Sequence, residues 1–316
     1  MNAQQRAQGA LLGQLAGDAL GSLVEFQGPE QIRRRYPQGV RDLADGGTWD
    51  TLAGQPTDDS ELALMLARSL VAEGTYHLEK VRERYYFWYQ SDPFDIGHTT
   101  RRGLRGDPDP SSQANGALMR ISPLGIFGAN RPLSEVAAWA AADSRLTHPH
   151  PICQQSNALY AMAIAFAVAE GPSPEQLYQQ LQQWSEELAV EPAIREWIAD
   201  AASAPPADYL RQQGWVRIAF HNALWQLLHA PNLEEAIMDS VMRGGDTDTN
   251  AAICGALLGA VQGLAAIPER WRDCLLHCTP QAGRPGVQRP RPRCFWPVDA
   301  LELAEQLLAK GQVTQK

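Results

Sequence analysis

The chain has 316 residues, a formal net charge of −9, and a composition that is 44% hydrophobic and 20% charged. This composition is typical of a soluble globular protein and argues against an intrinsically disordered chain. Because duplex-binding proteins usually carry a basic surface, the negative charge argues against nucleic acid as the main partner. The cysteines are odd in number and widely spaced, which excludes the usual framework of a disulfide-rich secreted domain.

Two apolar runs raise the question of a membrane span. Residues 158–169 are too few to cross a bilayer, which needs about 20 apolar residues. Residues 251–267 also fall short, and they contain Gln262 and three glycines. The N-terminus lacks the charged start and the clean apolar run of a signal peptide. We therefore expect a cytoplasmic protein without membrane association, in which both runs form buried helices.

Helical periodicity dominates the chain and predicts an all-α fold. Apolar residues recur at helical intervals in the segments 9–24, 60–72, 78–89, 133–142, 154–169, 174–188, 194–202, 215–228, 233–242, 250–266 and 299–308. No convincing series of alternating strands lies between them. Since no break in composition marks an internal boundary, we expect residues 1–316 to form a single compact multi-helix domain.

A short sequence repeat links the two ends of the chain. The segment GALLG at residues 9–13 recurs at residues 255–259, and each copy belongs to a series of glycines spaced by four residues. Glycine in a helix interior costs roughly 1 kcal/mol relative to alanine. A spacing of four places the glycines on one face, where another backbone can approach closely. We expect two tightly packed core helices, in the simplest case packed on each other.

Two acidic clusters precede predicted helices, and the first contains Thr57, Asp58 and Asp59. Taken alone, this cluster is explained by helix capping, because Asp and Thr are good N-cap residues and acids are stabilised near a helix N-terminus. Adjacent carboxylates, however, point about 100° apart on a helix. They therefore suit two neighbouring metal ions better than one.

The second cluster contains Asp246, Asp248 and Thr249, and it follows two glycines that give the loop freedom to fold back on a ligand. Its hard oxygen ligands suit Mg²⁺, Mn²⁺ or Ca²⁺ rather than zinc. Several carboxylates held close together would repel one another unless cations neutralise them. Two such clusters, each opening an apolar helix, therefore favour a shared metal site.

Other interpretations of the second cluster can be compared with the sequence. An EF-hand loop would need Gly and Glu at the positions of Ala251 and Leu257, so that interpretation fails. A phosphatase loop of the haloacid-dehalogenase type follows a buried strand near the start of an α/β fold, and it stays open as a weak alternative. A plain loop without a ligand also stays open.

Six motifs, in this order, resemble the ADP-ribosylglycohydrolase family, which includes the dinitrogenase-reductase-activating glycohydrolase and the ADP-ribosylarginine hydrolases. They cover nearly the whole chain and read GALLGQLAGDALG (9–21), TDDS (57–60), DIGHTTR (95–101), NGALMRISPLG (115–125), THP (147–149) and GGDTDTN (244–250). Each motif is weak alone, whereas six in the right order form a strong signal. The resemblance implies an all-α domain with a binuclear Mg²⁺ or Mn²⁺ centre at the base of an ADP-ribose cleft.

The resemblance also implies a role for each matching residue. The metal ligands would be Thr57, Asp58, Asp59, Asp246, Asp248 and Thr249. The loop of Asn115 and Gly116 would cradle the diphosphate, for which the amides of a helix N-terminus are suited, and His148 would line that pocket.

The resemblance places a further segment beside the scissile bond. Its ribose-contacting residues would be Asp95, Gly97 and His98, and His98 stands where relatives often carry Asn. A carboxylate would steer the attacking water, and the sequence leaves open whether this is Asp59 or Asp95.

Together these residues predict a metal-dependent hydrolase that cleaves the N-glycosidic bond between ADP-ribose and a modified side chain, with arginine favoured. Carboxylates stabilise the oxocarbenium-like state at C1 of the ribose, and metals hold ribose hydroxyls and lower the pKa of water. The cofactors would be two Mg²⁺ or Mn²⁺ ions, the substrate an ADP-ribosylated protein, and the product ADP-ribose. The alternatives are a metal-dependent phosphohydrolase and a non-catalytic relative that binds ADP-ribose or a toxin.

Overall fold

The computed structural model describes residues 1–312, which form helices and no β-strand, as the sequence predicts. The α-helices are α1 (Ala3–Gly21), α2 (Pro29–Arg35), α3 (Asp58–Glu73), α4 (Leu78–Gln90), α5 (His98–Leu104), α6 (Ser122–Phe127), α7 (Leu133–Arg145), α8 (Pro151–Glu170), α9 (Pro174–Glu187), α10 (Pro192–Asp200), α11 (Val216–His229), α12 (Leu233–Met242), α13 (Thr247–Gln262), α14 (Glu269–Leu276) and α15 (Ala300–Lys310). The 3-10 helices are η1 (Gly128–Asn130), η2 (Leu264–Ala266) and η3 (Arg293–Phe295).

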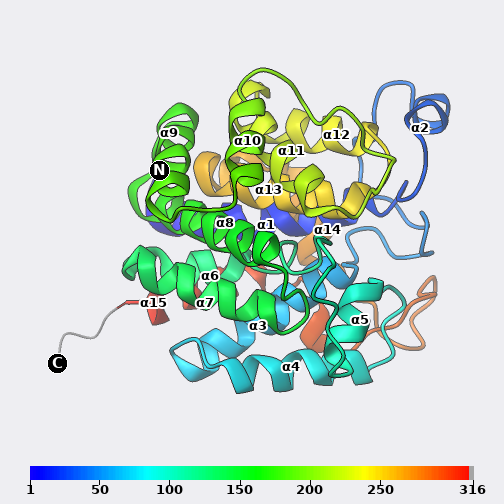
Figure 1. The fold of residues 1–316 in the computed structure, drawn as a ribbon. Helices are drawn as coiled ribbons and strands as arrows, with labels where there is room; N and C mark the ends of the chain where they lie inside the picture. Colours follow the sequence, from blue (N-terminus) through cyan, green and yellow to red (C-terminus); the bar gives the residue numbers. More distant parts are fainter. Residues whose placement is uncertain (313–316) are drawn as a thin grey trace.

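Helices α1 and α13 pack against each other through the centre of the molecule (Figure 1). A β-carbon at Gly13 would lie 2.2 Å from the carbonyl oxygen of Gly255, and one at Gly9 would lie 2.4 Å from that of Gly259. The two helices are therefore so close that the backbone of one occupies the space of a side chain on the other. This contact confirms the prediction that the glycine-rich helices pack on each other.

The contact continues to the end of α1, where Gly21 lies against the backbone of Asp248. A β-carbon at Gly21 would lie 2.4 Å from the Asp248 Cα. The hydroxyl of Thr247 donates a hydrogen bond to the Gly21 carbonyl oxygen at 2.7 Å. The end of α1 is thus fastened to the start of α13, where the second acidic cluster lies.

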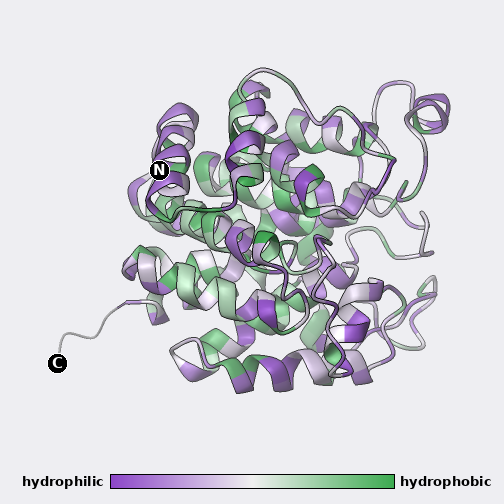
Figure 2. Ribbon diagram, viewed as in Figure 1, coloured by the Kyte–Doolittle hydropathy of each residue, from purple (hydrophilic) through white to green (hydrophobic). Residues whose placement is uncertain are grey.

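The other helices surround this inner pair. Helices α11 and α12 pack on α13 on one side, while α3 and α4 pack together on the opposite side of the inner pair (Figure 1). Helix α7 packs along α8, which contacts both α1 and α13. Figure 2 shows mostly hydrophobic residues on α8 and α13 and mostly hydrophilic residues on α9, at the edge of the molecule.

Helix α8 spans 20 residues, more than the apolar run 158–169, because polar residues form its first turns. By length and composition alone, this helix of the described chain is able to cross a membrane, but 72% of its apolar window is buried inside the protein. Such burial is typical of a core helix, and it agrees with the prediction of a buried helix here.

Four short helices differ from the prediction. The periodicity does not predict α2, α5, α6 or α14, which have only 7, 7, 6 and 8 residues and therefore too few turns to show an apolar pattern. The helix expected to continue to residue 266 ends at Gln262 instead. Gly263 adopts a φ of 76°, which closes α13 and leads into η2.

The segment 279–293, rich in Pro and Arg, is mostly exposed and is attached to the core through Arg291. Arg291 is buried and donates two hydrogen bonds of 2.8 Å to the carboxylate of Glu61 in α3. The indole of Trp88 in α4 donates to the same carboxylate at 2.7 Å. This buried pair fixes α3 against α4 and against the C-terminal segment.

Candidate active site

Two acidic segments that are far apart in the sequence meet at one point of the structure. Asp58 and Asp59 open α3, and Asp248 and Thr249 lie in the first turn of α13. The hydroxyl of Thr249 donates a hydrogen bond to the Asp59 carboxylate at 3.2 Å, across 190 positions of sequence. The structure therefore brings together the two clusters that the sequence predicts to share a site.

Asp18 of α1 holds the start of α3 in this position. Its carboxylate accepts hydrogen bonds from the Thr57 amide at 3.2 Å, the Thr57 hydroxyl at 2.8 Å and the Ser60 amide at 3.1 Å. It thus satisfies the Ser60 amide, which an N-cap side chain of the same helix usually satisfies. Neither Thr57 nor Asp246 makes a side-chain capping bond of its own, so capping does not explain the two clusters.

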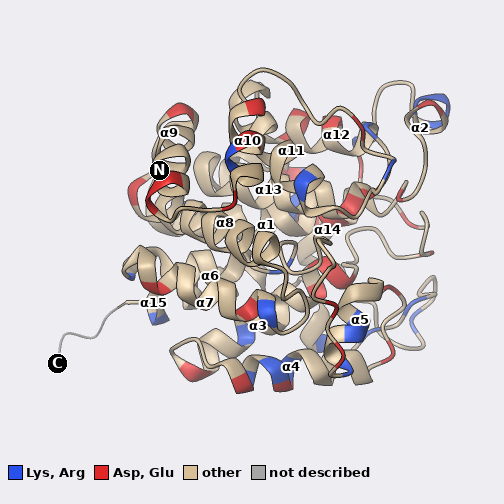
Figure 3. Cartoon of the chain, viewed as in Figure 1, with Lys and Arg blue, Asp and Glu red and all other residues tan. Residues whose placement is uncertain are grey.

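The two helix starts line a cavity of about 430 Å³. Among the predicted site residues, those that line it are Asp58, Asp59, Asp95, Gly97, His98, Asn115, Gly116, His148, Asp246, Asp248 and Thr249. Thr57 is the exception, because it is fully buried and its hydroxyl faces Asp18, so its role as a ligand stays a prediction. Figure 3 shows acidic residues gathered between α13 and α5, on this side of the molecule.

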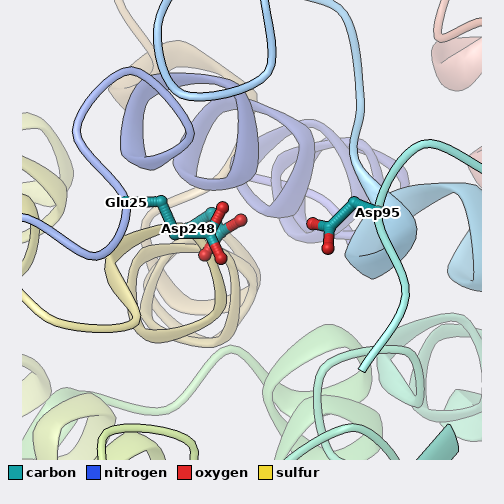
Figure 4. A group of neighbouring side chains, drawn as sticks. All are labelled: Glu25, Asp95 and Asp248. Atoms are coloured by element: carbon teal, nitrogen blue, oxygen red, sulfur yellow. The ribbon is translucent and has the colours of Figure 1, made fainter. Parts of the chain in front are cut away.

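The structure adds Glu25 to the acidic residues of the cavity, although no motif singles it out. Glu25, Asp95 and Asp248, here called the three-acid group, each offer a carboxylate oxygen, and these oxygens lie within 4.8 Å of one another. Figure 4 shows Asp95 facing Glu25 and Asp248 across the space between them. Glu25 lies in the loop after α1, and its only signal in the sequence is its position just behind the first glycine motif.

The carboxylates of the cavity raise one another's pKa. Burial is the main cause, and neighbouring carboxylate charges add to it. The pKa of Asp58 rises to about 7 and that of Asp95 to about 11, while the pKa values of Asp59 and Asp248 lie well above the usual range. None of the ion pairs formed by the described residues involves these carboxylates.

This donor set fits a hard divalent cation. One buried carboxylate oxygen of Asp59 has no hydrogen-bond partner, and every acidic group around it offers oxygen, the ligand that Mg²⁺ and Mn²⁺ prefer. A bound cation would neutralise the repulsion that raises the pKa values, and it would satisfy the unpartnered oxygen. The residues present therefore suit the cations that the sequence predicts.

The structure differs from the expectation that the amides of a helix N-terminus at Asn115 and Gly116 bind the diphosphate. Asn115 and Gly116 do not lie at a helix N-terminus. They lie in a turn ahead of α6, which begins only at Ser122. The Asn115 side chain donates a hydrogen bond to Asp246 at 2.7 Å, and its backbone amide donates to the Gly214 carbonyl oxygen at 3.0 Å. Asn115 thus braces the acidic cluster, and its amide is not free for a phosphate.

A small polar recess lies beside Gly116. A β-carbon at Gly116 would lie 2.7 Å from the hydroxyl oxygen of Thr100 and 3.1 Å from His148 Nε2. Both of these atoms are buried and have no hydrogen-bond partner. The missing side chain of Gly116 therefore leaves room for a ligand oxygen that both groups can bind, and Thr100 joins the site as a residue that the sequence prediction did not include.

The hydrogen bond at Nδ1 of His148 determines which ring nitrogen carries the proton. The Thr147 hydroxyl accepts a hydrogen bond from the Arg120 guanidinium at 2.9 Å and lies 2.7 Å from His148 Nδ1. We assign its proton to the bond with Nδ1, which places the ring proton on Nε2. Burial, followed by the charge of Arg120, lowers the pKa of His148 to about 3. His148 therefore presents a neutral N–H donor to the recess.

Comparison with known proteins identifies the family and the fold. A family model described as ADP-ribosylglycohydrolase matches residues 1–316. The chain belongs to the ADP-ribosylglycohydrolase family. The ADP-ribosyl-(dinitrogen reductase) glycohydrolase of Rhodospirillum rubrum is 30% identical over 276 residues, which cover 84% of this chain and 88% of that protein.

Two further relatives agree with this assignment to the ADP-ribosylglycohydrolase family. The ADP-ribosylarginine hydrolase Tri1 of Pseudomonas putida is 29% identical, with 85% of this chain and 74% of that protein covered. A solved structure described as an ADP-ribosylglycohydrolase-related protein complex has a TM-score of 0.80 and 28% identity, with 98% of this chain and 99% of that chain covered. The family resemblance and the all-α ADP-ribosylglycohydrolase fold are thus confirmed.

Membership of the ADP-ribosylglycohydrolase family supports a hydrolase, and the named relatives act on ADP-ribosylated substrates. The haloacid-dehalogenase alternative, in contrast, requires a buried strand ahead of Asp246. In the described chain the element that precedes Asp246 is helix α12. The topology therefore removes the basis for that alternative.

Proposed function

We propose that this chain is a metal-dependent ADP-ribosylglycohydrolase that releases ADP-ribose from modified arginine side chains of proteins, using two Mg²⁺ or Mn²⁺ ions. The observation that carries the proposal is the hydrogen bond from Thr249 to Asp59, which joins the two acidic helix starts at one cavity. The acidic residues that line this cavity are Glu25, Asp58, Asp59, Asp95, Asp246 and Asp248.

The residues that would hold the cations are Asp58, Asp59, Asp246, Asp248 and Thr249, with Thr57 as the sixth predicted ligand. When bound, the cations supply positive charge that holds ribose hydroxyls and lowers the pKa of water. Asp18 accepts three hydrogen bonds from Thr57 and Ser60 and would fix the orientation of the ligands on α3.

The polar groups away from the acids suit the nucleotide part of the substrate. The Thr100 hydroxyl and His148 Nε2 face the recess at Gly116 and are able to donate hydrogen bonds to one diphosphate or ribose oxygen. The Gly97 amide donates to Asp58 at 3.2 Å, which fixes the loop that carries Asp95 beside the acidic cluster. The nucleotide would thus lie against the recess, with the scissile bond toward Asp95.

The reaction breaks the bond between C1 of the ribose and a guanidine nitrogen. The electron pair of this bond stays on nitrogen, and the carboxylates stabilise the oxocarbenium-like ribose. Water adds its hydroxyl group to C1, and the proton it loses passes through a carboxylate to the departing neutral guanidine. Asp59 and Asp95 both face the cavity, and either can carry this proton. Separate assays of Asp59→Asn and Asp95→Asn distinguish them, since loss of the base lowers kcat while ADP-ribose affinity remains.

Two features support arginine as the modified side chain. The residues that line the cavity include six acids and neither Lys nor Arg, which favours a modified side chain that is cationic in the bound substrate. The relative from Pseudomonas putida carries the name of an ADP-ribosylarginine hydrolase.

The test is to incubate the protein with arginine-, serine- and nucleotide-linked ADP-ribose, with Mg²⁺ or with EDTA, and to measure free ADP-ribose. We expect release from the arginine-linked substrate only with the metal. Asp58→Asn and Asp248→Asn should each lower this rate more than about 100-fold, since even outer partners of metal ligands change activity about 10- to 100-fold. Asp107→Asn is the matched control, because Asp107 is exposed, pairs with Arg102 and lies outside the cavity lining.

Two other outcomes would overturn the proposal in different ways. Release of phosphate without release of ADP-ribose would favour the phosphohydrolase. Tight binding of ADP-ribose in calorimetry, with no hydrolysis of any of the three linkages, would favour the non-catalytic binding relative.

A further inference from the structure

Three aromatic rings form a connected chain at the cavity. The Phe26 and Trp49 ring centroids lie 6.4 Å apart and nearly perpendicular, and those of Trp49 and Phe94 lie 6.1 Å apart. Phe26 and Trp49 line the cavity. Phe26 directly follows Glu25 and Phe94 directly precedes Asp95. The chain of rings therefore connects the two sides of the three-acid group.

Phe26 adopts a backbone conformation that is energetically unfavourable for a bulky residue. Its φ is 65°, in the left-handed region that bulky residues avoid, and its side chain is 54% exposed. Two backbone hydrogen bonds hold this loop in place, from the Phe26 amide to the Gly245 carbonyl oxygen at 2.8 Å and from the Gly245 amide to that of Gln27 at 3.0 Å. Backbone strain maintained at a binding cavity points to a functional role.

The other two rings lie on loops that also contain a residue in the left-handed region, which Asp tolerates better than Phe. Asp50, which follows Trp49, and Asp92, which lies two residues before Phe94, both have a φ of 54°. Of the remaining non-glycine residues of the described chain with positive φ, Gln212 adjoins Gln213 of the cavity lining, whereas Ala189 lies outside it. Non-glycine residues with positive φ in the described chain are thus concentrated around this cavity.

Hydrogen bonds within the protein hold Trp49 in place. Its indole donates a hydrogen bond to Glu25 at 2.6 Å, and its carbonyl oxygen accepts one from the Arg289 side chain at 2.8 Å. The neighbouring Thr48 hydroxyl donates to the Glu25 carbonyl oxygen at 3.0 Å. A ring held in this way loses little conformational freedom when a ligand stacks on it, so the surface is preorganised.

The chemistry of this surface matches a guanidinium group. A guanidinium is planar, delocalised and weakly hydrated, and it stacks on aromatic rings more readily than other cations of proteins. Carboxyl groups flank the rings at both ends, at Glu25 and Asp95, and their oxygens can accept hydrogen bonds from the N–H groups of a guanidinium. The hydroxyl group of serine offers neither a charge nor a plane to such a surface.

We propose that Phe26 and Trp49 bind the guanidinium of the modified arginine and give the enzyme its preference for arginine-linked over serine-linked ADP-ribose, with Phe94 supporting the Trp49 ring from outside the cavity lining. This inference rests on the proposed function. It makes Phe26 and Trp49 specificity-determining residues, which contact the part of the substrate that leaves and not the ADP-ribose that stays.

Phe26→Asn is the test variant, because Asn removes the ring and tolerates the left-handed conformation. We expect kcat/KM for arginine-linked ADP-ribose to fall about 3- to 30-fold, the range of a cation–π contact. Binding of free ADP-ribose, measured by calorimetry, should stay unchanged, since the product lacks the leaving group. Phe26→Tyr retains the ring and should restore the wild-type value. Ala189→Asn makes the matched change at a positive φ of 47° away from the cavity and should alter neither quantity.

Several results would overturn this inference. One is an unchanged kcat/KM of Phe26→Asn on the arginine-linked substrate. Others are an equal loss of ADP-ribose affinity, which would indicate a merely structural role, and a Tyr variant as slow as the Asn variant. Equal rates of the wild type on arginine- and serine-linked ADP-ribose would also refute the stated preference. If the wild type releases nothing from the arginine-linked substrate, the proposed function itself fails, so the wild-type rate separates the two failures.

Discussion

Replacing Gly13 with alanine tests whether the close approach of α1 and α13 holds the site together. The added β-carbon would lie 2.2 Å from the Gly255 carbonyl oxygen and 2.9 Å from its carbonyl carbon. Since nonbonded atoms attract best at about 3.5 Å, the helices must separate locally by about 1 Å. Alanine gains about 1 kcal/mol in helix propensity, whereas overpacking costs about 1–3 kcal/mol or more.

The steric effect should win for Gly13→Ala, because rigid backbone lies on both sides of the contact. We expect a net loss of about 2 kcal/mol and a melting temperature lower by about 4 °C, measured by calorimetry and urea unfolding. Activity should also fall, since α1 carries Asp18, which fastens α3. Gly28→Ala is the control, as no atom lies within 4 Å of its β-carbon position and its φ is −79°. A Gly13→Ala protein as stable as the wild type would refute the reasoning.

The remaining predictions concern the two faces of the cavity. Asp18→Asn should weaken Mg²⁺ binding about 10- to 100-fold in calorimetric titration, because Asp18 orients the start of α3. Gly116→Ala should weaken ADP-ribose binding about 5- to 100-fold, since its β-carbon would lie 2.7 Å from the Thr100 hydroxyl and block hydrogen bonds that contribute about 0.5–1.5 kcal/mol each. Without divalent cations, stability should fall as pH rises. The folded pKa of Asp58, about 7, exceeds its ordinary value of 3.8, so the stabilisation present below that value is lost as pH rises through 7.

Each of these three predictions would be contradicted by a specific result. Unchanged Mg²⁺ affinity in Asp18→Asn would show that α3 keeps its position without that carboxylate. A Gly116→Ala protein that binds ADP-ribose normally would exclude the recess as part of the nucleotide site. For the pH dependence, the EDTA-treated protein should melt lower at about pH 8 than at about pH 5.5, and excess Mg²⁺ should raise the melting temperature at the higher pH. A melting temperature that rises between these values without metal would contradict the argument.

The sequence predicts those parts of the fold that leave a periodic or repeated pattern. The long helices follow from apolar spacing, and the glycine series predicts that α1 and α13 pack closely. The acidic clusters predict a common site because acids of this kind need a shared counter-charge. The helical period is a local signal, whereas the glycine series and the acidic cluster each occur twice, at two distant positions of the sequence.

The sequence does not predict which groups, distant along the chain, contact or hydrogen-bond one another in the fold. Asp18 caps α3 from another helix. No pattern near residue 57 predicts that the hydrogen-bond acceptor of the Thr57 hydroxyl lies 39 positions away. Glu25 joins the three-acid group only through the path of a loop, and Phe26 is an ordinary apolar residue until its φ and exposure are known. Asn115 suggests a free amide in the sequence, whereas the structure uses that amide in a bond to Gly214.

The pairing of α1 with α13 also sets the order in which this protein can be made. The innermost contact joins the first helix to one that ends at Gln262, so a ribosome has translated most of the message before α1 meets its partner. Contacts of such long sequence separation form late, after a large loop has closed. Until then the nascent chain holds one acidic helix start without the other. A message truncated ahead of α13 would therefore encode a chain that lacks Asp248 and Thr249 and leaves the inner face of α1 uncovered.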